Sequence, residues 1–362
     1  MRQTTWLPGT NPGGTPLRPP RRTATPGRPW DRSAGRRPLR VILSAIALAG
    51  AAGLLLLPRP AQAGSCCGGG GGAALILPES IKAALDLSFD WEKYDGFWNT
   101  AGEHLDDPPG SDLNQYRVNL SGAWRLSPRW QVGGSVPYVW NSNVYSGTAS
   151  HTDGLGDSTV SFWYEALRER SVWKIQSLSD LTPSVTVGAS LLIPTGISPY
   201  DDVESSFDVT GRGFYRIDGN VQIDKGYMPW NVSASLSYGT YIERSVNREY
   251  GKYVQPFDKD LGDRFSSTLS LGYKYFLGTA GDSLTGTASW SYLHEGDGTV
   301  DGKSDPSVAF RKNSVGFALL YSSTDHDWSV RASWNHAIMR DGYGANFPTT
   351  DILSVGVRYA FR

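Results

Sequence analysis

The chain has 362 residues, with 34 Lys and Arg against 35 Asp and Glu, and therefore a formal net charge of −1 at pH 7. Because binding to nucleic acid depends on clustered basic side chains, this balance excludes nucleic acid as an expected partner. The composition is rich in glycine and aromatic residues, with 42 Gly, 13 Trp and 18 Tyr beside 3 Met and 2 Cys. That usage departs from an ordinary soluble domain and requires a structural explanation.

Residues 1–63 have the layout of an N-terminal extension followed by a secretory signal peptide. An apolar run, VILSAIALAGAAGLLLLP, begins at Val41 after a cluster of arginines, and a triplet of small and polar residues ends at Ala63. We expect cleavage near Ala63, and the surplus upstream residues suggest that translation starts near Leu39 or Val41. The alternative is a transmembrane anchor, although the run is short and the segment 58–60 interrupts it.

Residues 64–78 are expected to form a periplasmic leader rich in cysteine and glycine. Cys66 and Cys67 are adjacent and precede five glycines. A lipid-anchor site is one interpretation, but the residues before Cys66 lack the expected large aliphatic side chain. An intermolecular disulfide, a metal contact and a redox role remain open, as does a leader with incidental thiols.

From residue 79 to residue 362 the pattern has a period of two, which places successive side chains on opposite faces of a strand. In the first segment Leu85, Leu87 and Phe89 share one face, whereas Asp86 and Asp90 share the other. Twelve strands of about ten residues are expected near 85–92, 115–125, 130–140, 158–167, 184–194, 214–224, 230–241, 264–276, 284–293, 313–322, 328–337 and 351–361.

Three features favour a membrane barrel over a soluble sandwich. Strands of this length suit a tilted crossing of the hydrocarbon layer. Long and short connections alternate, with 168–183 as the exception because it should be short. Trp130, Trp230 and Trp328 each open a strand after a short connection, so they are expected at the periplasmic interface. The sequence predicts an all-β, transmembrane, antiparallel up-and-down β-barrel of about 12 strands in an outer membrane. The alternative is a soluble β-protein in which the aromatic residues form the core.

The polar face of the strands is expected to line the interior, which for twelve strands is wider than side chains alone can fill. Both signs of charge are present there, in one of two arrangements. Opposed ladders would produce a transverse field across a pore, whereas paired charges would fill the barrel as a neutral plug, and the sequence leaves both open. The predicted pore-lining residues are Asp86, Asp90, Arg117, Arg125, Arg216, Asp218, Lys274, Arg331 and Arg358.

Two stretches carry a family resemblance: DGLGD at 153–157, which continues into STVSFWYEAL, and PSVTV at 183–187, which continues through LLIPTG to Gly196. They resemble the MetA-pathway-of-phenol-degradation family of outer-membrane proteins, often labelled transporters. The resemblance implies a channel for hydrophobic or aromatic small molecules. The aromatic end of the last strand, at 359–361, resembles the signal read by the outer-membrane assembly machinery, although Arg362 follows it.

An enzyme is not expected. His336 is the one histidine within a predicted strand, and the sequence has no nucleophile elbow, no metal-ligand cluster and no CxxCH for haem attachment. We therefore expect no catalytic residue, metal or cofactor. The expected function is passive passage of small solutes, with membrane lipid and a small-molecule solute as partners. The alternative is a non-catalytic scaffold or sleeve for a periplasmic or cell-surface partner.

Overall fold

The computed structural model describes residues 75–98, 103–169, 176–278, 281–325, 327–343 and 349–362. The predicted signal peptide, its cleavage at Ala63, and Cys66 and Cys67 lie outside these residues. Within the described ranges, no helix is long and apolar enough to cross a membrane.

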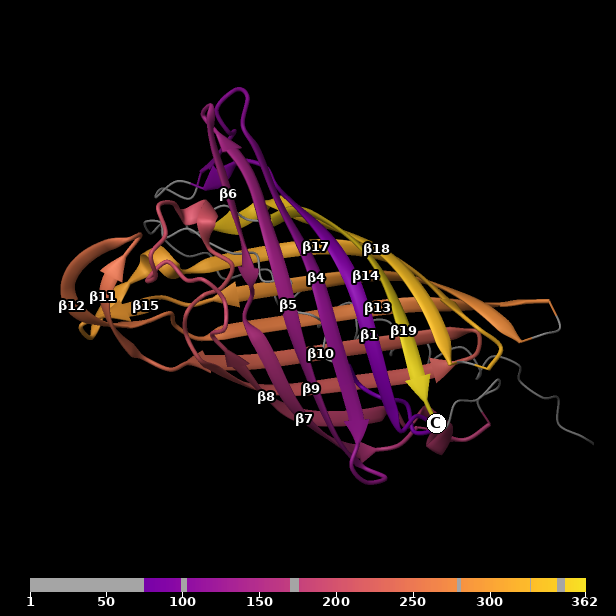
Figure 1. Ribbon diagram of the computed structural model, residues 1–362. Helices are drawn as coiled ribbons and strands as arrows, with labels where there is room; N and C mark the ends of the chain where they lie inside the picture. The colour runs from indigo at the N-terminus through magenta and orange to yellow at the C-terminus, as the bar shows by residue number, and fades with distance from the viewer. Residues whose placement is uncertain (1–74, 99–102, 170–175, 279–280, 326, 344–348) are drawn as a thin grey trace, which may run out of the picture. The chain divides into compact units, whose positions relative to one another are not determined.

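The described strands form a closed antiparallel barrel (Figure 1). Its sheet contains thirteen strands in the order β4-β1-β19-β18-β17-β14-β13-β10-β9-β8-β7-β5-β6, and the β4–β5 pairing closes it. Because β6 and β7 pair with successive parts of β5, they act as one wall strand, so the barrel wall has twelve strands. The strands are β1 (Ala83–Tyr94), β4 (Asp112–Arg125), β5 (Trp130–Tyr145), β6 (Thr148–Leu155), β7 (Ser158–Leu167), β8 (Ser184–Ile193), β9 (Arg216–Tyr227), β10 (Trp230–Tyr241), β13 (Arg264–Leu277), β14 (Asp282–Glu295), β17 (Phe310–Ser322), β18 (Trp328–Tyr343) and β19 (Thr349–Phe361). The predicted all-β barrel and its twelve strands are confirmed.

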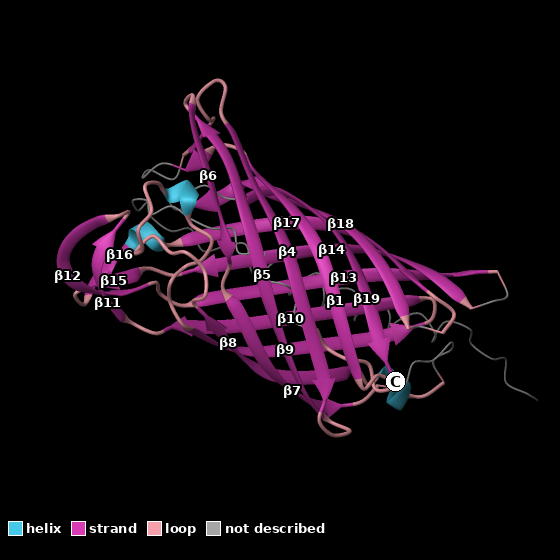
Figure 2. Ribbon diagram, in the orientation of Figure 1, coloured by secondary structure: helices cyan, strands magenta, loops and turns pink. Residues whose placement is uncertain are grey.

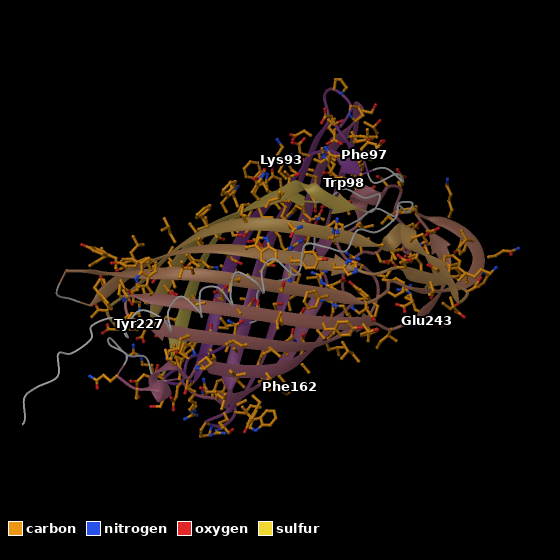
Figure 3. The ribbon with its side chains drawn as sticks, turned by 180° about the vertical axis from the view of Figure 1, so that it is seen from behind. Lys93, Phe97, Trp98, Phe162, Tyr227 and Glu243 are labelled. Atoms are coloured by element: carbon orange, nitrogen blue, oxygen red, sulfur yellow. The ribbon has the colours of Figure 1, made fainter. Side chains whose placement is uncertain are left out.

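The two faces of the wall show why these sequences form a barrel and not a soluble sandwich. Along β1, Leu85 and Leu87 are about half exposed (52% and 49%), whereas Asp86 and Glu92 are buried (4% and 0%). Phe162 likewise projects from the outer surface (Figure 3). Apolar side chains outside and charged side chains inside are the arrangement that a hydrocarbon solvent favours. The alternative of a soluble aromatic core is therefore wrong.

The two ends of the barrel differ. At the first, which we call the terminal end, β1 begins and β19 ends, and Trp130, Trp230 and Trp328 begin β5, β10 and β18. The connections there are short, apart from the one that contains the 3-10 helix η2 (Leu178–Leu181).

At the opposite end, which we call the loop end, the connections are long and carry structure of their own (Figure 2). Two small sheets form there, together with two short 3-10 helices. These elements are β2 (Phe97–Trp98), β3 (His104–Leu105), β11 (Arg244–Glu249), β12 (Lys252–Asp260), β15 (Gly298–Val300), β16 (Lys303–Asp305), η3 (Ser206–Asp208) and η4 (Pro306–Val308).

Candidate functional site: the barrel lumen

The interior face of β1, β4, β18 and β19 carries a dense set of ion pairs. Asp86 accepts hydrogen bonds from Arg331 (Nη2 to Oδ1, 2.7 Å) and Arg358 (Nε to Oδ2, 3.1 Å). Glu92 and Arg117 form a second pair at 2.9 Å, with side chains 0% and 8% exposed. Of the predicted residues, this wall therefore brings together Asp86, Arg331 and Arg358, with Arg117 close by on β4.

The facing wall holds a separate pair. Arg216 donates to Asp218 across 2.7 Å and to the Tyr241 hydroxyl across 3.0 Å. Among the described residues, these charges pair along each wall, which favours paired charges over opposed ladders, the two arrangements that the sequence left open. The sequence could not show the contacts of Asp86, because Arg331 and Arg358 lie on β18 and β19, which come beside β1 only when the barrel closes.

The remaining predicted residues lie apart from these pairs. Asp90 accepts a hydrogen bond from the Asn119 amide at 2.7 Å. Lys274 lies near the terminal end, with its ammonium 5.7 Å from the centre of the Phe276 ring, and forms no ion pair with a described residue. Arg125 lies at the terminal end beside Glu165, at 3.8 Å.

The N-terminal segment Leu75–Ile81 enters the terminal end of the lumen, where Leu75 and Leu77 pack against the buried Ala84 and Ala123. The amide N–H of Leu77 donates to Gln131 Oε1 at 2.7 Å. Arg125 donates to the carbonyl oxygens of Leu77 (2.5 Å), Pro78 (3.0 Å) and Ile81 (3.2 Å). Part of the predicted leader is thus fixed inside the barrel, a position that its composition did not indicate.

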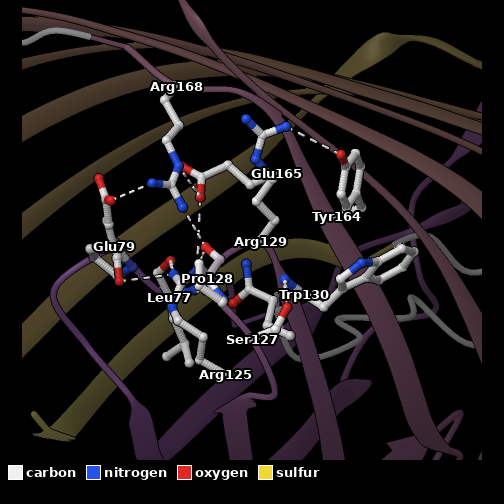
Figure 4. Close-up of polar contacts among 12 residues, drawn as sticks. Leu77, Glu79, Arg125, Ser127, Pro128, Arg129, Trp130, Tyr164, Glu165 and Arg168 are labelled. Carbon is white, nitrogen blue, oxygen red and sulfur yellow. Dashed lines mark hydrogen bonds and ion pairs between the residues drawn. The ribbon is translucent and has the colours of Figure 1, made fainter.

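A second contact holds the base of this segment. Arg168 forms an ion pair with Glu79 at 2.5 Å and donates to the carbonyl oxygen of Pro128, also at 2.5 Å (Figure 4). Arg168 lies in the connection 168–183, whose length was the exception to the predicted pattern. That connection begins with a side chain that holds the N-terminal segment.

At the loop end, the 195–213 loop and the small strands β11, β12, β15 and β16 form what we call the cap, and a buried carboxylate holds it together. Glu295 is 0% exposed and accepts hydrogen bonds from Arg212 (2.7 Å) and Arg264 (2.6 Å). Burial alone would lower the pKa of Arg212, but the Glu295 carboxylate raises it above its ordinary value. An apolar cluster packs beside this network and comprises Leu192, Tyr200, Phe214, Tyr241, Val246 and Leu261. Burial raises the pKa of the Tyr200 phenol.

The two stretches that carry the family resemblance meet at this cap. Asp157 accepts hydrogen bonds from the backbone N–H groups of Arg212 (2.7 Å) and Gly196 (3.1 Å). Thr195 Oγ1 donates to the carbonyl oxygen of Gly156 at 2.6 Å. A Cβ atom on Gly196 would lie 2.8 Å from the Gly211 Cα, so no other residue fits there without backbone movement. The stretches fasten the 195–213 loop to the barrel wall.

The described residues enclose two cavities within the lumen, the middle cavity and the terminal cavity. The middle cavity, of about 410 Å³, lies between the N-terminal segment and the charged pairs of the cap, and borders Leu75, Arg216 and Arg264. The terminal cavity, of about 610 Å³, borders Glu79, Arg168 and Arg358. Ile76 and Gln222 border both cavities and so lie at the boundary between them.

Glycines on the interior face leave room for the side chains opposite them. In five cross-strand pairs, a Cβ atom on the glycine would press against the side chain of its partner, because that side chain lies flat across the wall. The pairs are Trp163–Gly188, Asp218–Gly239, Asn231–Gly272, Asn335–Gly316 and Arg331–Gly356. This is a physical reason for part of the high glycine content.

No family model matches the chain. Among solved structures, it is similar to an outer membrane channel from Pseudomonas putida F1, at 15% identity and a TM-score of 0.57, over 80% of this chain and 98% of that one. It also matches the CymD monoaromatic hydrocarbon channel (12% identity, TM-score 0.37, 81% and 96% of the two chains). A further match is the P. putida toluene transporter TodX (12%, 0.34, 78% and 89%). The first likeness shows that the chain has the fold of an outer-membrane β-barrel.

Proposed function

We propose that the chain is an outer-membrane channel for the passive passage of small solutes. The observation that carries this proposal is a closed barrel with an apolar outer face and a polar inner face that encloses cavities of about 410 and 610 Å³. An interior of this kind is typical of barrels that conduct solutes and not of barrels filled by their own side chains. The similar P. putida protein is described as an outer membrane channel.

Location and partners follow from the same proposal. Export would require removal of the signal peptide near Ala63, and the aromatic end of β19 supports insertion by the assembly machinery. Membrane lipid would contact the outer face and a small solute the inner face, without a catalytic step. The family resemblance favours hydrophobic or aromatic solutes, and the names of CymD and TodX refer to such molecules.

Single-channel conductance in planar lipid bilayers tests this function, with the chain from Gly64 onward refolded. Lys274→Glu reverses an interior charge that has no ion-pair partner among the described residues, so the fold is retained. We expect discrete conductance steps, and in Lys274→Glu a shift of ion selectivity toward cations. Lys93→Glu is the matched control, because the exposed Lys93 side chain projects outward at the loop end (Figure 3).

A scaffold is the second candidate, and one observation favours it. The cap covers the loop end, and the N-terminal segment enters the terminal end. A folded, heat-modifiable barrel that conducts no ions in any bilayer would contradict the channel and support the scaffold.

A further inference from the structure

The middle cavity has the size of a small-molecule site. Its volume of about 410 Å³ falls within the roughly 300–1,000 Å³ typical of such sites. Leu75 and Ile76 border it on the side of the terminal end, and Arg216, Asp218 and Arg264 border it on the side of the cap.

The charged side chains that border the middle cavity are already paired within the protein. Arg216 pairs with Asp218 at 2.7 Å, and Arg264 pairs with the fully buried Glu295 at 2.6 Å. A charged solute in the cavity would have to compete with these internal partners while losing its hydration. The cavity therefore favours a neutral solute.

Hydroxyl groups are the most frequent polar groups in the lining. Seven serines and two threonines border the cavity, together with the amides of Asn220 and Gln222. Most small-molecule sites are instead lined mainly by apolar and aromatic side chains with a few polar groups. Hydroxyls both donate and accept, so this lining can replace the water around a solute that carries several oxygen atoms. A hydrocarbon could form none of these hydrogen bonds.

Trp163 gives this lining one unsatisfied hydrogen-bond donor. The residue is 4% exposed and borders the cavity, and its indole ring lies against Gly188, where an added Cβ atom would lie 2.5 Å from Trp163 Cε3. Its indole N–H is buried and has no hydrogen-bond partner among the described residues. Such a group carries a desolvation cost that an oxygen of a bound solute would remove.

We propose that the middle cavity is a binding site for a neutral, hydroxylated small solute, for which the serine and threonine hydroxyls line the wall and Trp163 supplies a hydrogen-bond donor. The proposal rests on the channel function and names the class of solute that the channel would take. It differs from the hydrophobic class that the family resemblance implies.

Titration calorimetry on the amphipol-bound barrel tests this site without requiring conduction. The probes are D-glucose and toluene, with amphipol alone as the blank. We expect glucose to bind and toluene to give no heat above the blank. Trp163→Phe keeps the aromatic surface but removes the N–H group, so it is expected to weaken glucose binding roughly 2- to 12-fold, the range of one neutral hydrogen bond. Trp290→Phe is the matched control, because Trp290 is 45% exposed on the outer face.

Gly188→Ala provides a second variant that retains the N–H group. Its Cβ atom would lie 2.5 Å from Trp163 Cε3 and 2.6 Å from the Phe162 carbonyl oxygen, so both must shift, and glucose binding should fall in a barrel that is still heat-modifiable. Binding of toluene without glucose would overturn the proposal in favour of a hydrocarbon, and binding of neither probe would overturn it outright. Glucose binding in a barrel that conducts nothing would leave the site standing while the channel function fails.

Discussion

Glu295 has two guanidinium partners and no exposure to solvent. Its oxygens receive Arg212 from the 195–213 loop and Arg264 from the start of β13. The carboxylate offsets the free-energy cost of burying both guanidinium groups. Without it, both groups would lose this partner while they stay away from water. Glu295 therefore connects the cap to the wall.

Glu295→Ala is expected to lower the free energy of unfolding by about 3–5 kcal/mol, as expected when one partner of a buried ion pair is removed. Denaturant unfolding of the barrel in lipid vesicles measures this change. Arg362→Ala is the control, because the Arg362–Asp327 pair at 3.2 Å is largely exposed and pairs of that kind contribute about 0–1 kcal/mol. Equal losses in the two variants would contradict the assigned role of Glu295.

At the scale of single residues, the alternating pattern predicted which side chains point inward. Asp86 and Arg331 were both expected on the interior face, and both are found there. Their mutual contact was not predictable, because β1 and β18 are far apart in the chain and become neighbours of β19 only when the barrel closes. The unsatisfied N–H of Trp163 was missed for a similar reason, since its surroundings depend on cross-strand register.

Among the structural elements, the N-terminal segment has the most direct bearing on passage through the lumen. Ile76 lies at the boundary of the two cavities, and four backbone groups of the segment are fixed by Gln131 and Arg125. Displacing this segment would join the middle and terminal cavities. The segment therefore narrows the lumen at the terminal end.

The double variant Arg125→Ala, Gln131→Ala removes the side chains that fix Leu77 and Pro78. We expect a larger single-channel conductance than in the unaltered chain, because the segment no longer holds its place in the lumen. Arg129→Ala is the matched control, because Arg129 donates to Tyr164, at 3.3 Å, and not to the segment. A conductance that is the same in the double variant and in the control would contradict this role.

The small elements of the cap were not predicted. The sequence placed β11 and β12 within one long loop, because short strands in a segment rich in Asp, Gly and Tyr lack the regular alternation of a wall strand. Their pairing depends on neighbours in other loops, such as β15, which pairs with β12. Alternation with a period of two arises where one face of a strand meets apolar surroundings and the other meets polar surroundings. A small sheet in the cap, over a polar lumen, does not have two such contrasting faces.

The whole barrel reverses the polarity of a soluble protein, with hydrocarbon-compatible side chains outside. Leu120 of β4 is 55% exposed, and its neighbour Ser121 is buried at 7%. For a soluble protein an exposed leucine is a minor liability, whereas in a bilayer it is the favoured residue. The free-energy cost of a charge on this face therefore depends on depth in the membrane.

Leu120→Arg is expected to make folding into lipid vesicles less favourable by about 2–4 kcal/mol, since Leu120 lies within the span of β4. Leu126→Arg, just beyond the end of β4 and 59% exposed, should cost only about 0–1 kcal/mol. Denaturant titrations of the two variants, side by side, measure the difference. Similar costs for both would argue against a membrane boundary near Arg125.

The interior glycines have a consequence for how the lumen could change in evolution. In each of the five pairs, the glycine leaves space that one methyl group would fill. Filling that space changes neither the number of strands nor the outer face of the barrel. Replacing such a glycine, or shortening the side chain that lies across it, would alter the bore locally while insertion and assembly proceed as before. Relatives with the same twelve-stranded wall can therefore differ in the size of solute they admit, and strand number alone is a poor guide to cargo.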